Sequence, residues 1–338
     1  MDMICKYLIQ SCLLISLIGF TACNSGTSAE EEPASPQPQT PEQTHAGNPV
    51  FRDMYTADPA ALVHNDTLYI FTGHDEQEAG GEGFVMNDWY VFSTTDMMNY
   101  TNHGARLQVA DFGWASGQAW AAHVVEKGGK FYWYITAEHK DIPGKAIGVA
   151  VADHPLGPYT DAVGEALITN DMTTHTDIAW DDIDPAVFID QDGSAYLYWG
   201  NTVLKYAKLK DNMTELDGPI HTLDLPAFTE GPWLFERQGK YYLTYSAQFP
   251  EVIDYAMADS PEGPWTYQGR LNDTVPNSPT NHQAVVEYKG AWYFIYHTGS
   301  LPNGGEFRRS VSIDRLHFNE DGTMQEIVQT VEGVERVE

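Results

Sequence analysis

The chain has 338 residues, of which 12% are aromatic, with 29 Gly and 19 Pro. This composition favours many short strands joined by tight turns, and it supplies enough apolar material for a large core. The formal net charge of −30 disfavours nucleic acid as a partner, because its phosphates are also negative, whereas a neutral partner such as a glycan is compatible with it.

The first 22 residues have the features of a bacterial lipoprotein signal peptide. Lys6 precedes an apolar run, LIQSCLLISLIGF, that is too short and too close to the N-terminus for a typical membrane-spanning helix. The run ends in FTAC, which resembles a lipobox, with the small residue Ala22 directly before Cys23. We therefore expect cleavage before Cys23 and lipidation of its thiol. An ordinary secretory signal peptide with an incidental cysteine is the alternative.

A linker is predicted to follow the lipidated cysteine. Residues 24–47, NSGTSAEEEPASPQPQTPEQTHAG, are rich in Ser, Pro, Glu and Gln and have almost no apolar content. Such a segment cannot bury a core and is expected to form an extended tether. The predicted organisation is a signal peptide over 1–22, Cys23 and a flexible linker over 23–47, and one folded domain over 48–338. The protein would be an exported outer-membrane lipoprotein, on the cell surface or the periplasmic face.

A repeated phrase organises the predicted domain. Each copy is an apolar run, a turn and an aromatic strand, which together predict a β-hairpin. The turns are HND, EKGG, DQDG, RQG and YKG, and the five phrases begin at Asp58, Trp120, Asp184, Glu230 and His282. Their intervals of 46 to 64 residues suit four-stranded propeller blades with variable loops. We predict an all-β fold, a five-bladed β-propeller, with a β-sandwich as the alternative.

The leading positions of the five phrases are predicted to form a site. In a propeller the innermost strand of every blade runs along the central axis, so equivalent positions form a ring around it. All but Trp120 are polar or ionisable, and an unpaired buried carboxylate is costly. We therefore expect the five side chains to converge on one pocket.

Three carboxylates in one pocket suit the cleavage of a glycosidic bond. One carboxyl group must keep its proton for the leaving oxygen, while the other must be ionised. Crowded like charges raise some pKa values, which keeps a proton on one carboxyl group near neutral pH. Trp120, and Trp114 in WASGQAW, would offer flat apolar surfaces to a sugar ring. Core packing is the alternative role for both tryptophans.

Metal binding is the competing interpretation of the same ring. Asp, Glu and His side chains can hold Ca²⁺, Mg²⁺ or Zn²⁺, and DDIDPAVFIDQDG adds further acids. The sequence DQDG lacks the ligand spacing of an EF-hand loop, so a β-turn is predicted there, and the HExxH and CxxC patterns are absent from the sequence. A calcium role for His282 stays open.

The phrases around the three acids resemble the signature of glycoside hydrolase family 43. Asp58 stands in YTADPAALV, Asp184 in DDIDPAVFID and Glu230 in FTEGPWLFE, and the resemblance extends from about Asn48 to the C-terminus. It implies a five-bladed propeller and an inverting mechanism. In that mechanism Asp58 would be the general base, Glu230 the general acid, and Asp184 the residue that tunes the pKa of the acid and orients it. Inversion requires about 6.5–9.5 Å between base and acid, which leaves room for a water molecule.

The resemblance also implies substrate contacts. His282 is similar to a histidine that touches an axial calcium in some members, and no other cofactor is implied. Arg308 or Arg309 would bind sugar hydroxyls, and strand alternation lets only one of this adjacent pair face the pocket.

The implied substrates are plant cell-wall glycans that contain arabinose or xylose. The phrases look most like those of exo-acting α-L-arabinofuranosidases, which remove arabinose side chains from arabinan or arabinoxylan. The TEGPW form of the acid motif also occurs among β-xylosidases, which are the alternative within the family. A non-catalytic glycan-binding propeller on the cell surface is a second alternative, but it would not need three carboxylates.

Overall fold

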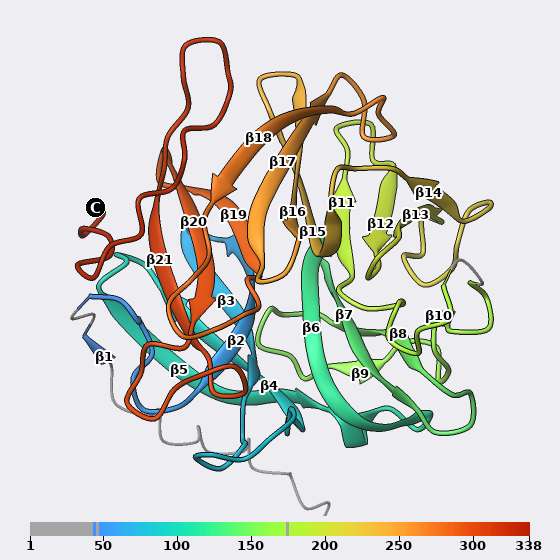
Figure 1. Ribbon diagram of the computed structural model, residues 1–338. Helices are drawn as coiled ribbons and strands as arrows, with labels where there is room; N and C mark the ends of the chain where they lie inside the picture. Colours follow the sequence, from blue (N-terminus) through green and yellow to red (C-terminus); the bar gives the residue numbers. More distant parts are fainter. Residues whose placement is uncertain (1–42, 45–46, 174–175) are drawn as a thin grey trace, which may run out of the picture. The chain divides into compact units, whose positions relative to one another are not determined.

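Five antiparallel sheets follow one another in the chain and lie around a common centre as the blades of a β-propeller (Figure 1). The computed structural model describes residues 43–44, 47–173 and 176–338, all of which belong to one compact unit. The predicted signal peptide, Cys23 and almost all of the predicted linker lie outside these residues. The prediction of an all-β, five-bladed propeller is confirmed.

The sheets have three to five strands each. The first sheet contains β1 (Gln43–Thr44), β2 (Thr56–His64), β3 (Thr67–His74), β4 (Asp88–Thr94) and β5 (Asn99–Gln108). A short 3-10 helix, η1 (Val109–Asp111), leads to the second sheet, which contains β6 (Ala115–Lys127), β7 (Lys130–His139), β8 (Lys145–Ala152), β9 (Thr160–Asp161) and β10 (Ile168–Thr169). The third sheet contains β11 (Ala186–Ile189), β12 (Ala195–Trp199), β13 (Leu204–Leu209) and β14 (His221–Leu223). The fourth contains β15 (Phe228–Arg237), β16 (Lys240–Ala247), β17 (Val252–Ala258) and β18 (Thr266–Asn272), and the fifth contains β19 (Gln283–Tyr288), β20 (Ala291–Thr298) and β21 (Ser310–Leu316).

The hairpin that opens each blade follows from its turn residues. Four of the five hairpins have two-residue loops in which both residues adopt positive φ, for example Asn65 and Asp66 at 49° and 57°. This is the type I′ geometry, which matches the twist of the flanking strands. In the third blade the loop is longer, and the amide of Gly193 donates to the carbonyl of Asp190. The five predicted hairpins and the predicted β-turn at DQDG are therefore confirmed.

The aromatic second strand of each hairpin is buried on both faces. All five residues of β12 are buried, and so are six of the eight residues of β3. A strand in the middle of a blade packs against the blades on either side, so both of its faces are covered. For this reason these strands are mostly apolar and aromatic and do not alternate regularly with polar residues.

The ring closes between the first and the last blade, and the chain segment before β2 makes the joint. The amide of Val50 donates to the carbonyl of Val311 in β21 at 2.7 Å, and the amide of Thr56 donates to the carbonyl of Arg309 at 2.9 Å. The amide of Val311 donates in turn to the hydroxyl of Thr56 at 3.2 Å. The segment before β2 thus runs beside the outermost strand of the three-stranded fifth sheet. In the part of the chain that the structure describes, no helix has the length and apolar character needed to cross a membrane.

Candidate active site

Asp58 and Asp184, which begin the first and third of the five phrases, share an unusual backbone conformation. Asp58 has a φ of 49° and Asp184 a φ of 59°, in the left-handed region that residues other than Gly rarely adopt. Asp58 lies where the pairing of β2 with β3 is interrupted by a bulge between Ala57 and Ala60. A bulge turns the strand locally and re-aims a side chain. Asp58 and Asp184, the latter two residues before β11, both line one cavity.

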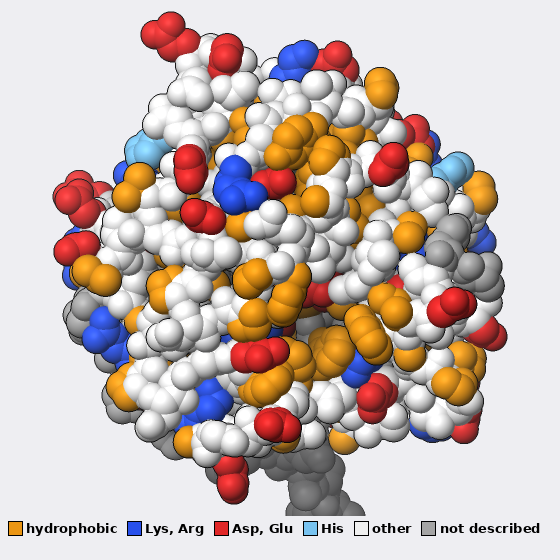
Figure 2. Space-filling model, viewed as in Figure 1, with side chains coloured by type: hydrophobic (Ala, Val, Ile, Leu, Met, Phe, Trp, Pro, Cys, Tyr) orange, Lys and Arg blue, Asp and Glu red, His pale blue; other side chains and the backbone are white. Residues whose placement is uncertain are grey.

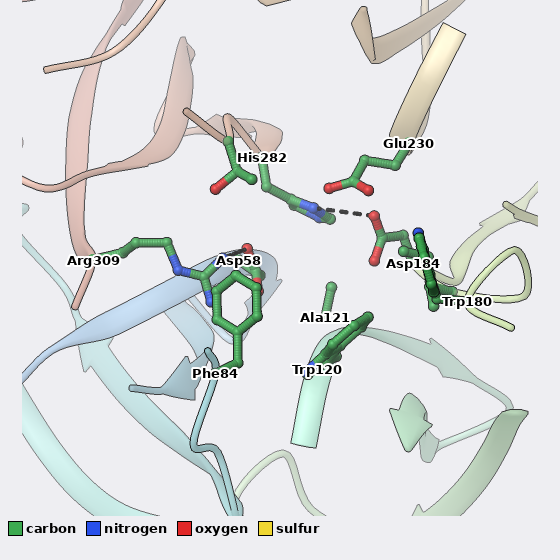
Figure 3. Close-up of a pocket in the computed structure, with 11 residues that line it drawn as sticks. Asp58, Phe84, Trp120, Ala121, Trp180, Asp184, Glu230, His282 and Arg309 are labelled. Atoms are coloured by element: carbon green, nitrogen blue, oxygen red, sulfur yellow. Dashed lines mark hydrogen bonds and ion pairs between the residues drawn. The ribbon is translucent and has the colours of Figure 1, made fainter. Parts of the chain in front are cut away.

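This cavity has a volume of about 350 Å³. Its walls include the first residue of every phrase, namely Asp58, Trp120, Asp184, Glu230 and His282. Figure 3 shows Glu230, Asp184 and His282 pointing toward one another, with Asp58 and Arg309 on the other side. On the face shown in Figure 2, hydrophobic side chains gather around a hollow near the middle. The predicted ring of five residues is therefore confirmed in position.

Asp58 is held as a carboxylate. Its Oδ1 accepts a hydrogen bond from Nη1 of Arg309 at 2.9 Å and lies 3.2 Å from Nδ1 of His297. Burial alone would raise the pKa of Asp58, but the Arg309 charge and the His297 contact outweigh it and hold this pKa well below its usual range. The guanidinium of Arg309 is fixed from its other side by a bidentate pair with Asp75, in which both N–O distances are 2.9 Å.

Glu230 has the opposite electrostatic setting. Burial raises the pKa of Glu230 to about 7, even though a hydrogen bond from Asn201 opposes the shift, and the negative charge of Asp58 adds to it. The Asn201 amide lies 2.6 Å from Oε2 of Glu230. At mildly acidic pH the cavity therefore pairs an ionised Asp58 with a protonated Glu230, which is the combination that acid–base catalysis needs.

Asp184 connects the acid to the rest of the cavity. Its Oδ2 accepts a hydrogen bond from the amide of Gly231, the residue after Glu230, at 3.0 Å. The same oxygen lies 3.6 Å from Nδ1 of His282. Burial and the neighbouring charge of Glu230 raise the pKa of Asp184 well above its usual range. Asp184 thus fixes the backbone that carries Glu230 and shares its electrostatic field.

His282 is the candidate calcium contact in this cavity. Burial lowers the pKa of His282 to about 4, so its ring is neutral at working pH. Calcium takes six to eight oxygen ligands. Among the described residues, His74, Glu76 and Asp88 form the one group of three possible metal-binding His, Cys, Asp or Glu side chains, with ligand atoms within 4.8 Å of one another. These three residues do not line this cavity.

Asp181 and Asp182, the first two acids of DDID, form ion pairs with a buried lysine. Asp181 and Asp182 are both buried and lie 3.0 Å and 3.1 Å from the ammonium group of Lys205, which is itself buried. The indole of Trp199 donates to Asp182 at 2.7 Å. The suggestion that these acids add metal ligands is therefore wrong for Asp181 and Asp182. Their pair with Lys205 instead holds the segment that leads into Asp184.

A family model for glycosyl hydrolases family 43 matches residues 46–324. The chain belongs to this family. Among its relatives, xylosidase/arabinosidase 43A of Humicola insolens is 32% identical over 81% of this chain and 97% of its own length. Arabinoxylan arabinofuranohydrolase of Bacillus subtilis is 31% identical over 96% of this chain and 72% of its own length.

A solved structure of the same family gives the matching fold. It is a β-xylosidase/α-arabinofuranosidase from a compost microbial metagenome, in complex with xylotriose and in a calcium-free form. Its TM-score with this family 43 enzyme is 0.75 at 31% sequence identity, and the match covers 85% of this chain and 98% of the other. These proteins support a glycoside hydrolase on a propeller fold.

The other predicted contact residues of this family 43 enzyme divide into two groups. Trp120 and Arg309 line the cavity. Trp114 does not, because its ring is 1% exposed and packs against Phe112 and His139, so the expectation that it is a sugar platform is wrong in this structure. Arg308 points elsewhere, with its guanidinium over the ring of Tyr55 at 4.0 Å. Of the pair, Arg309 alone lines the cavity, and both arginines lie just before β21.

Sequence reasoning missed several residues of the site. Trp180 and Phe84 line the cavity, and Asn201 contacts the acid. A fourth acid, Glu251, is buried beside the site and accepts a hydrogen bond from the amide of Asn281 at 2.8 Å. Trp180 stands four residues before Asp184, so an aromatic residue this close to a predicted site acid could have indicated a place in the site. Phe84 and Glu251 lie in loops, where no periodic pattern marks them.

Proposed function

We propose that the protein is an inverting, exo-acting α-L-arabinofuranosidase that removes arabinose from plant arabinan or arabinoxylan. The observation that carries the proposal is a pair of carboxyl groups in one small cavity, with Asp58 bonded to the Arg309 guanidinium and the carboxyl group of Glu230 bonded, among the described residues, only to the neutral amide of Asn201. A volume of about 350 Å³ lies near the lower end for ligand pockets, which suits one terminal sugar. Relatives named arabinoxylan arabinofuranohydrolase support the choice of sugar.

The proposed reaction follows from these two groups. Ionised Asp58 takes a proton from a water molecule, and the oxygen of that water attacks the anomeric carbon. Glu230 gives its proton to the glycosidic oxygen as the bond from that oxygen to the anomeric carbon breaks. The sugar leaves with inverted configuration, and exchange with solvent returns the proton from Asp58 and restores the proton on Glu230. Arg309 keeps Asp58 ionised, and Asp184 positions Glu230.

A β-xylosidase is the second candidate, because the relatives named above include enzymes with both activities. The two candidates differ in the sugar that the cavity accepts. We would measure release of 4-nitrophenol from its α-L-arabinofuranoside and β-D-xylopyranoside, and sugar release from arabinan and arabinoxylan. Faster cleavage of the xyloside would select the second candidate, and no cleavage of any of the four would contradict both. Proton NMR of the first product should show inversion, and retention would contradict the assigned roles.

The acid is tested by changing the leaving group. Glu230→Ala should lose about 10²–10⁴-fold on natural glycans, whose sugar leaving groups need a proton. It should keep far more activity on a dinitrophenyl glycoside, whose leaving group departs unprotonated. Asp58→Ala should lose activity on both substrates, because water must be activated in either case. Equal losses on the two substrates in the Glu230 variant would remove Glu230 from the acid role.

A further inference from the structure

A second cavity lies directly beside the catalytic one. It has a volume of about 290 Å³, compared with about 350 Å³ for the catalytic cavity. The side chains of Phe84, Trp120 and Trp180 line both cavities. Trp180 is 48% exposed, whereas Asp58 and Asp184 are 8% and 5% exposed. The shared aromatic wall therefore stands at the rim of the catalytic cavity, where the part of a glycan beyond the scissile bond must emerge.

The far side of this wall carries a fixed polar pair. The ammonium group of Lys145 lies 3.7 Å from the centre of the Trp120 ring and 3.4 Å from Oε1 of Glu138. Lys145 is 7% exposed in its side chain, while Glu138 is 51% exposed. Glu138, Lys145 and Ser116 line the second cavity and do not line the catalytic one.

The wall itself is held in place by contacts from within the protein. The indole of Trp120 donates to Oε1 of Gln118 at 3.0 Å, and Gln118 donates in turn to the carbonyl of Phe84 at 3.2 Å. The amide of Lys145 donates to the carbonyl of Ala179, the residue before Trp180, at 2.7 Å. The aromatic rings and the polar pair are thus part of one connected structure.

Aromatic faces beside charged hydrogen-bonding groups are suited to a neutral sugar. The C–H face of a sugar ring packs on an indole, and its hydroxyls bond to carboxylate and ammonium groups. We propose that the second cavity is a subsite for a neutral backbone sugar on the leaving-group side of the scissile bond. This rests on the proposed function, and it deepens it. The enzyme would then prefer a sugar attached to a glycan over the same sugar on a small aglycone.

Two variants test the subsite without touching the catalytic cavity. Ser116→Trp fills the second cavity with a bulky ring, and Glu138→Ala removes a polar partner. For each we would measure kcat/KM on 4-nitrophenyl α-L-arabinofuranoside and on two oligosaccharides, arabinose-substituted xylotriose and arabinotriose. The ratio of oligosaccharide to aryl glycoside should fall about 5- to 30-fold, mainly through KM, which is the size of one or two lost hydrogen bonds. The oligosaccharide whose ratio falls identifies the backbone as xylan or arabinan.

Glu126→Ala is the matched control, because it removes a carboxylate from the opposite end of β6, where Glu126 bonds only His64 among the described residues. Its ratio should stay unchanged. An unchanged ratio in both test variants, on both oligosaccharides, would overturn the subsite. If the wild type cleaves none of these substrates, the proposed function fails, and the subsite is then decided by calorimetric binding of xylotriose and arabinotriose. Loss of that binding in Ser116→Trp would support the subsite, and equal binding, or none in the wild type, would overturn it.

Discussion

We expect the hydrogen bond from Asn201 to Glu230 to set the upper pH limit of activity. The amide lies 2.6 Å from Oε2 of Glu230 and favours the ionised carboxylate, so it lowers a pKa that burial has raised to about 7. A hydrogen bond to a charged group contributes about 1.5–3 kcal/mol, and each pKa unit corresponds to about 1.4 kcal/mol. Asn201→Ala should therefore raise the pKa of Glu230 by about one to two units.

The pH profile of kcat/KM on an arabino-oligosaccharide measures this shift, because the basic limb reports the pKa of the acid in the free enzyme. At pH 8 the wild type should keep about a tenth of its own maximum, whereas a variant with a limb near 8.5 should keep about three quarters. Asn212→Ala is the matched control, since this exposed amide also lies 2.6 Å from a glutamate oxygen, that of Glu215. A limb that stays in place or moves to lower pH in Asn201→Ala would refute the reasoning.

Four further predictions concern stability, the base and the anchor. Glu230→Gln should stabilise the protein at pH 8 by up to about 3 kcal/mol, and the gain should fade toward pH 4.5. The reason is that the pKa of Glu230 is raised to about 7 in the folded protein, so this carboxyl group binds more protons folded than unfolded between these pH values, and the wild type loses stability as pH rises. A gain in thermal midpoint that persists at pH 4.5 would contradict this origin. Lys205→Met should cost about 3–5 kcal/mol in denaturant unfolding, because it leaves two buried carboxylates unpaired, whereas Lys208→Met breaks an exposed pair with Glu262 and should cost at most about 1 kcal/mol. Arg309→Met should depress kcat/KM most at acidic pH, because the pKa of Asp58 rises once the guanidinium is gone, and an unchanged acidic limb would show that Arg309 does not act on Asp58. We also propose that Cys23 carries a lipid anchor, so Cys23→Ser should move the protein from the membrane to the soluble fraction, and a variant that stays with the membrane would exclude the anchor.

The ring of site residues could be predicted because the five phrases are copies of one structural unit. Once the hairpins are aligned, Asp58 and Glu230 occupy equivalent places, and the propeller brings such places together. The prediction that one of the two adjacent arginines faces the pocket left the choice open, and Arg309 is the one that lines the cavity.

Trp114 shows where such pattern reasoning fails. It lies six residues before Trp120, an even spacing that would put both rings on the same face of a regular strand. However, β6 begins at Ala115, and its pairing with β7 is shifted between Ala115 and Gly117 and again between Gly117 and Trp120. Each irregularity breaks the period of two, so the parity of the spacing no longer predicts the direction of the side chain.

Loop residues were out of reach for a different reason. Phe84 and Trp180 reach the cavity from segments outside the strands, and the contact between Asn201 and Glu230 joins two different blades. Their positions depend on how long connections fold over the blades, which neither hydrophobic period nor turn chemistry determines. Crowding predicted that some pKa values would rise, as those of Glu230 and Asp184 do, but burial is the larger cause there and Arg309 lowers the pKa of Asp58.

The joint between the first and last blades also determines when the catalytic cavity is completed during folding. Asp58 and Arg309 are 251 residues apart in the chain, yet their contact is part of the catalytic cavity. During folding Asp58 therefore lacks its arginine until the last blade has docked beside the segment that precedes β2. A protein whose seam opens would lose the contact between Arg309 and Asp58, and with it the charge that keeps this carboxylate ionised. Enzymatic activity is thus a direct readout of whether the two ends of the propeller are joined.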